Sequence, residues 1–136
     1  MNDPTIAQQP SKAASRTGLA LTVLVSAFLL FDAVIHISNI PVVEESFAAM
    51  GYPAWTAGII GALELVGIAL YLVPRTNLLG AIYLSAYLGG AFASQLRVEA
   101  PLFSTLLFPV YVGAMVWLGL YLRDPEVRRI LPIRRG

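Results

Sequence analysis

Three ionisable residues, Asp32, His36 and Glu64, lie within long apolar runs of this 136-residue chain. If those runs are helices in a bilayer, an ionisable side chain near the centre costs roughly 2.5 to 3.5 kcal/mol, so each needs a physical reason. Asp32 and His36 are four residues apart, which places both on one helix face, one turn apart. Such a set either links helices through polar contacts or lines a ligand cavity.

Four apolar runs are predicted to carry these residues. Each is about long enough to cross a ~30 Å hydrocarbon core as a helix, and none alternates in polarity like a barrel strand. The sequence therefore predicts an all-α membrane protein with four transmembrane helices in an antiparallel up-down-up-down bundle. A segment with proline at its start, acids in its first turn and glycine at its end, residues 41–51, predicts a short outer-face helix between the first two spans. The predicted spans are 17–40, 54–73, 78–96 and 102–122.

The basic residues predict the orientation. Eight of the nine flank one side of the predicted spans, and only Arg97 falls on the other, so both termini should be cytoplasmic. We expect a flexible cytoplasmic leader at 1–16, the transmembrane domain at 17–122, and a basic cytoplasmic tail at 123–136. The eight basic residues are Lys12, Arg16, Arg75, Arg123, Arg128, Arg129, Arg134 and Arg135.

Helix geometry predicts that the polar residues gather in the outer half of the bundle. Glu64 should lie near the midplane, where burial disfavours its charged form, so we expect a neutral carboxyl that hydrogen-bonds across the bundle. A purely structural interpretation makes Asp32–His36 a local pair and places Arg97 at the interface. We favour an outward-opening cavity for a small hydrophobic ligand. The predicted ligand-binding residues are Asp32, His36, Glu64, Tyr83, Tyr87, Gln95, Arg97 and Tyr111.

Small residues recur at helical spacing in the second and third spans. Such rows let backbones approach closely in lipid. We therefore expect close helix packing within the chain, and the alternative is that one row forms a homodimer face. The packing residues are predicted to be Gly61, Ser85, Gly89 and Ala93.

Composition argues against several kinds of site. The chain has no cysteine, so thiol chemistry, Fe–S clusters and thiolate metal sites are not supported, and its single histidine does not support bis-histidine haem. No dinucleotide fingerprint or nucleophile elbow is present, so flavin binding and a catalytic triad are not supported. We expect no metal site, no catalytic residue and no nucleic-acid partner.

Four stretches of the sequence are distinctive when taken together: FLLFDAVIHI, SFAAMGYPAW, LYLVPRTNLLGAIYLSAYLGGA and PLFSTLLFPVYVGAMVWLGLYLRDP. With them, the chain resembles the DoxX-like family of small bacterial four-helix membrane proteins. The family takes its name from a membrane subunit of a thiosulfate:quinone oxidoreductase, and relatives occur in oxidoreductase complexes linked to thiol and sulfur stress. The resemblance implies a four-helix fold, and it assigns no catalytic position in this sequence.

These observations predict an accessory membrane protein, without catalytic activity alone, that binds a quinone-like or other small hydrophobic ligand. Its partners would be the lipid bilayer, that ligand, and a membrane oxidoreductase or a second copy of the chain. One alternative is a structural or chaperone-like membrane protein, and a weaker one is a proton-coupled carrier that works as a dimer.

The charge distribution gives a first test. Reporter domains fused after Gly136 and inserted within 44–50 should report opposite compartments, with the C-terminal reporter in the cytoplasm. A periplasmic reporter after Gly136 would contradict the four-span topology. Enzymatic reporters that are active in only one compartment provide the measurement.

Overall fold

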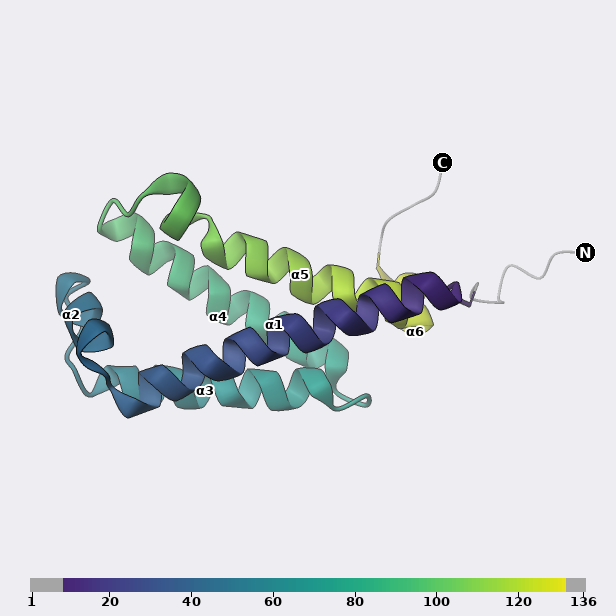
Figure 1. The fold of residues 1–136 in the computed structure, drawn as a ribbon, viewed down its shortest axis with the longest axis horizontal. Coiled ribbons are helices and arrows are strands. Elements are labelled where there is room, and N and C mark those ends of the chain that lie inside the picture. Colours follow the sequence, from purple (N-terminus) through teal and green to yellow (C-terminus); the bar gives the residue numbers. More distant parts are fainter. Residues whose placement is uncertain (1–8, 132–136) are drawn as a thin grey trace, which may run out of the picture.

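The computed structural model describes residues 9–131, and this part of the chain is all-helical, with no strands (Figure 1). Positions 1–8 of the predicted leader lie outside the described residues, as do positions 132–136 of the predicted tail, with Arg134 and Arg135. The four long helices are α1 (Lys12–Ser38), α3 (Thr56–Leu72), α4 (Asn77–Arg97) and α5 (Phe108–Arg123). The short elements are α2 (Pro41–Ala49), the π-helical turn η1 (Leu102–Leu106) and α6 (Pro125–Ile130).

The long helices pack around one core. Helix α1 lies against α3 and α5, and α4 lies against the same two helices. Figure 1 shows successive long helices running in opposite directions. The start of α1, the α3–α4 turn and α6 therefore lie at one end of the bundle, the α6 end, whereas α2 and η1 lie at the other, the α2 end.

Polar contacts tie the helices together at the α6 end. The buried Tyr71 hydroxyl donates to the Val116 carbonyl oxygen at 2.7 Å, which joins α3 to α5. The Arg123 guanidinium donates to Thr22 Oγ1 at 3.0 Å, joining α5 to α1, and lies over the Tyr71 ring. Asn77, at the start of α4, donates to Asp124 at 2.8 Å. A polar network therefore closes this end, and it was not predicted from the sequence.

The outer surface of the bundle is apolar. Two helical stretches, Lys12–Ser38 and Leu102–Arg123, are long and apolar enough to cross a membrane, while α3 is a shorter apolar helix of 17 residues. Large apolar side chains project outward from all four long helices, an arrangement that a water-soluble monomer rarely shows. Examples are Leu19, Val23, Leu24, Phe31, Ile59, Val66, Leu79, Ile82, Val110 and Leu118.

The fourth apolar run differs from the continuous helix expected at 102–122. The main-chain N–H groups of Leu106 and Leu107 donate to the carbonyl oxygens five residues earlier, at Pro101 and Leu102, so the run begins with one π-helical turn. The regular helix α5 then starts at Phe108. Pro109 lacks an N–H and cannot continue the earlier hydrogen-bond ladder, which accounts for the break. The outer-face helix expected at 41–51 is present as α2.

The glycine contacts correct one packing expectation. A Cβ added to Gly89 would meet no atom of residues 9–131 within 4 Å, so the helix contact expected there is absent from this part of the chain. Each helical residue advances ~100°, so Gly89 points roughly 140° away from the buried Leu84. Helices α3 and α4 instead approach at Gly67 and Gly80. The other predicted packing residues differ in burial. Gly61 is buried against α1, whereas Ser85 and Ala93 are exposed, as Gly89 is.

Ser85 nevertheless contacts a neighbouring helix, because its hydroxyl oxygen accepts a hydrogen bond from the Trp117 indole N–H at 2.8 Å. This bond joins the outer edges of α4 and α5. The small-residue row therefore begins at a helix–helix contact and continues along the exposed surface of α4 through Gly89 and Ala93.

Two glycine-to-alanine substitutions in α4 test this packing. A methyl group at Gly80 would lie 2.6 Å from the Leu70 carbonyl carbon, so Gly80→Ala should lower the free energy of unfolding by about 1 to 3 kcal/mol. Gly89→Ala meets open space and should be neutral or stabilise by up to about 1 kcal/mol through helix propensity. Unfolding of both variants in one detergent gives the comparison. Equal stability of the two would contradict the assigned contact.

Candidate functional site

A cavity of about 640 Å³ lies at the α2 end of the bundle. Its lining comes from all four long helices, from α2, from η1 and from the loop that precedes α3. The volume lies within the range of roughly 300 to 1,000 Å³ that is typical of small-molecule sites. The walls are mostly apolar, and a few polar side chains converge at one place within them.

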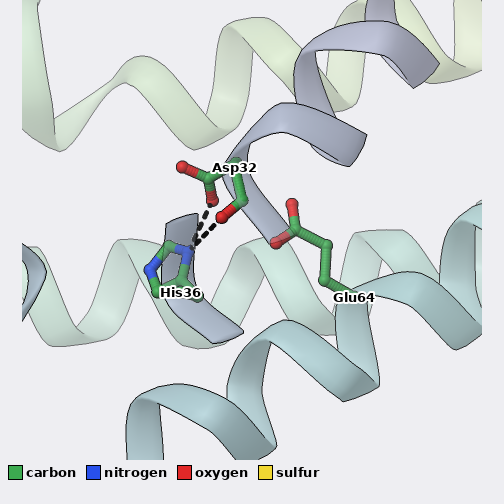
Figure 2. Close-up of side chains that lie close together, drawn as sticks. All are labelled: Asp32, His36 and Glu64. Atoms are coloured by element: carbon green, nitrogen blue, oxygen red, sulfur yellow. Dashed lines mark hydrogen bonds and ion pairs between the residues drawn. The ribbon is translucent and has the colours of Figure 1, made fainter. Parts of the chain in front are cut away.

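Asp32 and His36 form the first part of that polar group. His36 Nδ1 lies 2.7 Å from the main-chain oxygen of Asp32 and 3.2 Å from its carboxylate Oδ2 (Figure 2). The i, i+4 spacing on α1 produces this pairing, as the sequence predicts. The His36 ring also packs edge-on against Phe47 of α2, with 5.5 Å between the ring centres. These contacts fix the imidazole between its own helix and α2.

Glu64 of α3 completes the group and is fully buried. The Tyr87 hydroxyl of α4 donates to Glu64 Oε2 at 3.1 Å. The other oxygen, Oε1, has no hydrogen-bond partner among the described residues. One oxygen or nitrogen from each of Asp32, His36 and Glu64 lies within 4.8 Å of the other two, and Figure 2 shows the side chains converging from two helices.

Gly61 allows this convergence. It lies three residues before Glu64 on α3, and a Cβ added there would come within 2.7 Å of the Ala33 carbonyl oxygen and 3.0 Å of His36 Cβ. Any side chain would therefore force α3 away from α1. The missing Cβ brings Glu64 close to the Asp32–His36 pair.

Hydroxyl groups and a loop contact border the outer part of the cavity. The Tyr52 hydroxyl and Ser94 Oγ lie 2.8 Å apart, which connects the loop before α3 to α4. Ser104 and Thr105 of η1 also line the cavity. These four lining residues were not predicted from the sequence, although Tyr52 lies next to Pro53, and Ser104 and Thr105 follow closely after Pro101.

Only some of the eight predicted ligand-binding residues line the cavity in the structure. Five line the cavity: Asp32, His36, Glu64, Tyr87 and Gln95. The other three lie outside its lining. Tyr83 is one turn nearer the α6 end, where its hydroxyl donates to the Leu63 carbonyl oxygen at 2.9 Å. Arg97 and Tyr111 are exposed on the surface.

The polar group can carry out limited chemistry. Two carboxyl groups and an imidazole can share or exchange protons, and they can hydrogen-bond to the head group of a ligand. The same three residues are a candidate metal donor set. However, His36 Nδ1 already contacts the main-chain oxygen and one carboxylate oxygen of Asp32, which favours a hydrogen-bonded group over coordination.

One comparison with known proteins gives a result. A family model described as the DoxX-like family matches residues 20–119, a range that contains every residue lining the cavity. No curated protein and no solved structure matches the chain.

The hydrogen bond from Tyr87 is open to a direct test. Tyr87→Phe leaves the buried Glu64 carboxyl without its donor and should lower the free energy of unfolding by about 1 to 3 kcal/mol. Tyr111→Phe removes the hydroxyl of an exposed tyrosine and should change stability by less than about 0.5 kcal/mol. Both variants are unfolded in the same detergent as the parent. A loss of stability in Tyr111→Phe that equals the loss in Tyr87→Phe would contradict this role.

Proposed function

The chain belongs to the DoxX-like family, and from that premise we propose that it is a four-span protein of the bacterial inner membrane. The apolar outer surface of the bundle supports this proposal. At ~1.5 Å per residue, the 21 residues of α4 and the 17 of α3 extend about 31 Å and 25 Å, comparable with a hydrocarbon core. Basic residues gather near the α6 end, which supports a cytoplasmic location for that end.

The function that the site supports best is binding of a small hydrophobic ligand, such as a quinone-like molecule. The observation that carries this proposal is the cavity itself, whose apolar walls enclose a buried carboxyl with one unpaired oxygen. An apolar pocket with a few convergent polar groups suits a ligand that has an apolar body and one polar head group.

The ligand-binding role is that of an accessory subunit. The polar group contains no activated nucleophile and offers only carboxyl, imidazole and hydroxyl groups to a ligand. We assign any redox reaction of a bound quinone to a membrane oxidoreductase partner. In this role, the protein holds the ligand in the outer half of the bilayer and presents it to that partner.

A structural role through helix contacts with a partner is the second candidate. It draws support from the small residues exposed along α4, where Gly89 and Ala93 would allow another helix to approach closely. A membrane protein with only this role would retain no specific small molecule after purification.

Neighbouring glycines in α4 offer a matched test of ligand binding. Gly90 lines the cavity and Gly89 does not, and a Cβ at either position would meet open space. Gly90→Leu should fill part of the cavity and lower the content of co-purified hydrophobic small molecules several-fold, while Gly89→Leu should retain the parent content. Mass spectrometry of extracts from protein purified in native lipid provides the measurement.

Both variants should fold, which thermal unfolding checks. Equal ligand content in Gly90→Leu and in the parent would place any bound molecule elsewhere. A parent protein without a specific small molecule would favour the structural role.

A further inference from the structure

The cavity contains more acidic than basic groups. Its lining includes two acids, Asp32 and Glu64, and one basic residue, His36. A protonated His36 balances the charge of Asp32, with which it is paired at 3.2 Å. With His36 paired to Asp32, the lining offers no second basic residue that could pair with Glu64. Arg97 is exposed outside the cavity, and Arg123 is bonded to Thr22 at the α6 end.

The Glu64 carboxyl is incompletely satisfied when it is ionised. Oε1 is then a buried acceptor with no donor among the described residues. Buried polar atoms are normally paired, and buried charges normally have a counter-charge. A ligand that brings both a donor and a positive charge would correct both deficits.

The groups beside Glu64 favour a ligand that donates hydrogen bonds. The donors that contact the two carboxyl groups are already used, because Tyr87 donates to Glu64 and His36 Nδ1 contacts Asp32. The Nε2–H of a protonated His36 remains as a donor beside them, whereas the ionised carboxyl groups themselves offer only acceptors. A quinone carbonyl is itself only an acceptor, so this corner suits an ammonium better than a carbonyl.

Aromatic rings form much of the apolar wall. Phe28 and Phe108 pack edge to face with 5.2 Å between ring centres, and Phe47 lies 5.8 Å from Tyr52. All four line the cavity together with Tyr87. Aromatic faces attract cations through their quadrupole, and they also provide apolar surface for the body of a ligand.

We infer that the cavity binds a lipophilic amine in its protonated form, with the ammonium between Glu64 Oε1 and the Asp32 carboxylate and its apolar body against the aromatic wall. This inference rests on the proposed ligand-binding function and deepens it by naming the class of ligand. The volume of about 640 Å³ accommodates an amine with one or two rings or a short alkyl chain.

Three probes separate charge from size and from hydrogen bonding. They are 4-phenylbutylamine, its neutral analogue 4-phenylbutanol, and decylubiquinone, and each is titrated by calorimetry against the full chain in detergent at neutral pH. We expect the amine to bind at least tenfold more tightly than the alcohol or the quinone. Equal binding of alcohol and amine would overturn the cationic class, and tighter binding of decylubiquinone would overturn it in favour of a quinone.

Matched variants locate the binding group. Glu64→Gln should weaken amine binding at least tenfold, and Asp32→Asn should do so as a second variant if Glu64→Gln fails to fold. Glu45→Gln removes the same charge from an exposed position on α2 and should leave binding unchanged. Equal weakening by Glu45→Gln would indicate general charge attraction and overturn the assigned site.

Two further results distinguish the inference from the function on which it rests. If no amine binds but a hydrophobic molecule sensitive to Gly90→Leu co-purifies, the inference fails and the proposed function stands. If neither is found, both fail. A Glu64-dependent gain in thermal stability with Zn²⁺ or Mn²⁺, and none with the amine, would overturn the inference in favour of a metal site.

Discussion

The close approach of α3 to α1 at Gly61 is the constraint on which the rest of the site depends. Only a residue without a Cβ fits against the Ala33 carbonyl and His36 at this crossing. Glu64 follows one turn later, so this crossing determines how near its carboxyl lies to the Asp32–His36 pair. The burial of Glu64 and the grouping of the three ionisable residues both depend on that contact.

The two ends of the bundle are stabilised by different means. At the α6 end, Thr22, Tyr71 and Arg123 connect three helices through hydrogen bonds, and tight glycine contacts leave little space. At the α2 end, the helices are held by aromatic packing and by the bond between Tyr52 and Ser94. The first arrangement is closely packed, whereas the second encloses space, so the cavity forms at the α2 end.

The sequence predicts the features of this molecule that depend on local spacing. The Asp32–His36 pair, the helix α2 and the family follow from residue intervals and short motifs. The face of α4 that contacts its neighbours was harder to predict, because both of its sides carry small residues. In the structure, Leu84 and Leu88 pack into the core, so Gly89 lies on the outward face of α4.

The contacts that connecting segments make with the cavity also could not be predicted from the sequence. Phe47 and Tyr52 reach the cavity because of how α2 and its following loop fold back, and Ser104 and Thr105 reach it because of a π-helical turn. Tyr83 is excluded from the cavity because its hydroxyl bonds to the main chain of α3. In each case, the tertiary fold determines whether the residue reaches the cavity, and the residue type alone does not predict this.

The unequal lengths of the helices have a consequence for the surrounding lipid. Helix α1 has 27 residues and α3 has 17, which correspond to about 40 Å and 25 Å at ~1.5 Å per residue. If both cross one bilayer, α1 must tilt or extend beyond the acyl chains, and the leaflet beside α3 must become thinner. Hydrophobic mismatch is therefore concentrated on the side of the bundle that also carries Glu64. Acyl-chain length in the host membrane would act first on the helix that positions this carboxyl.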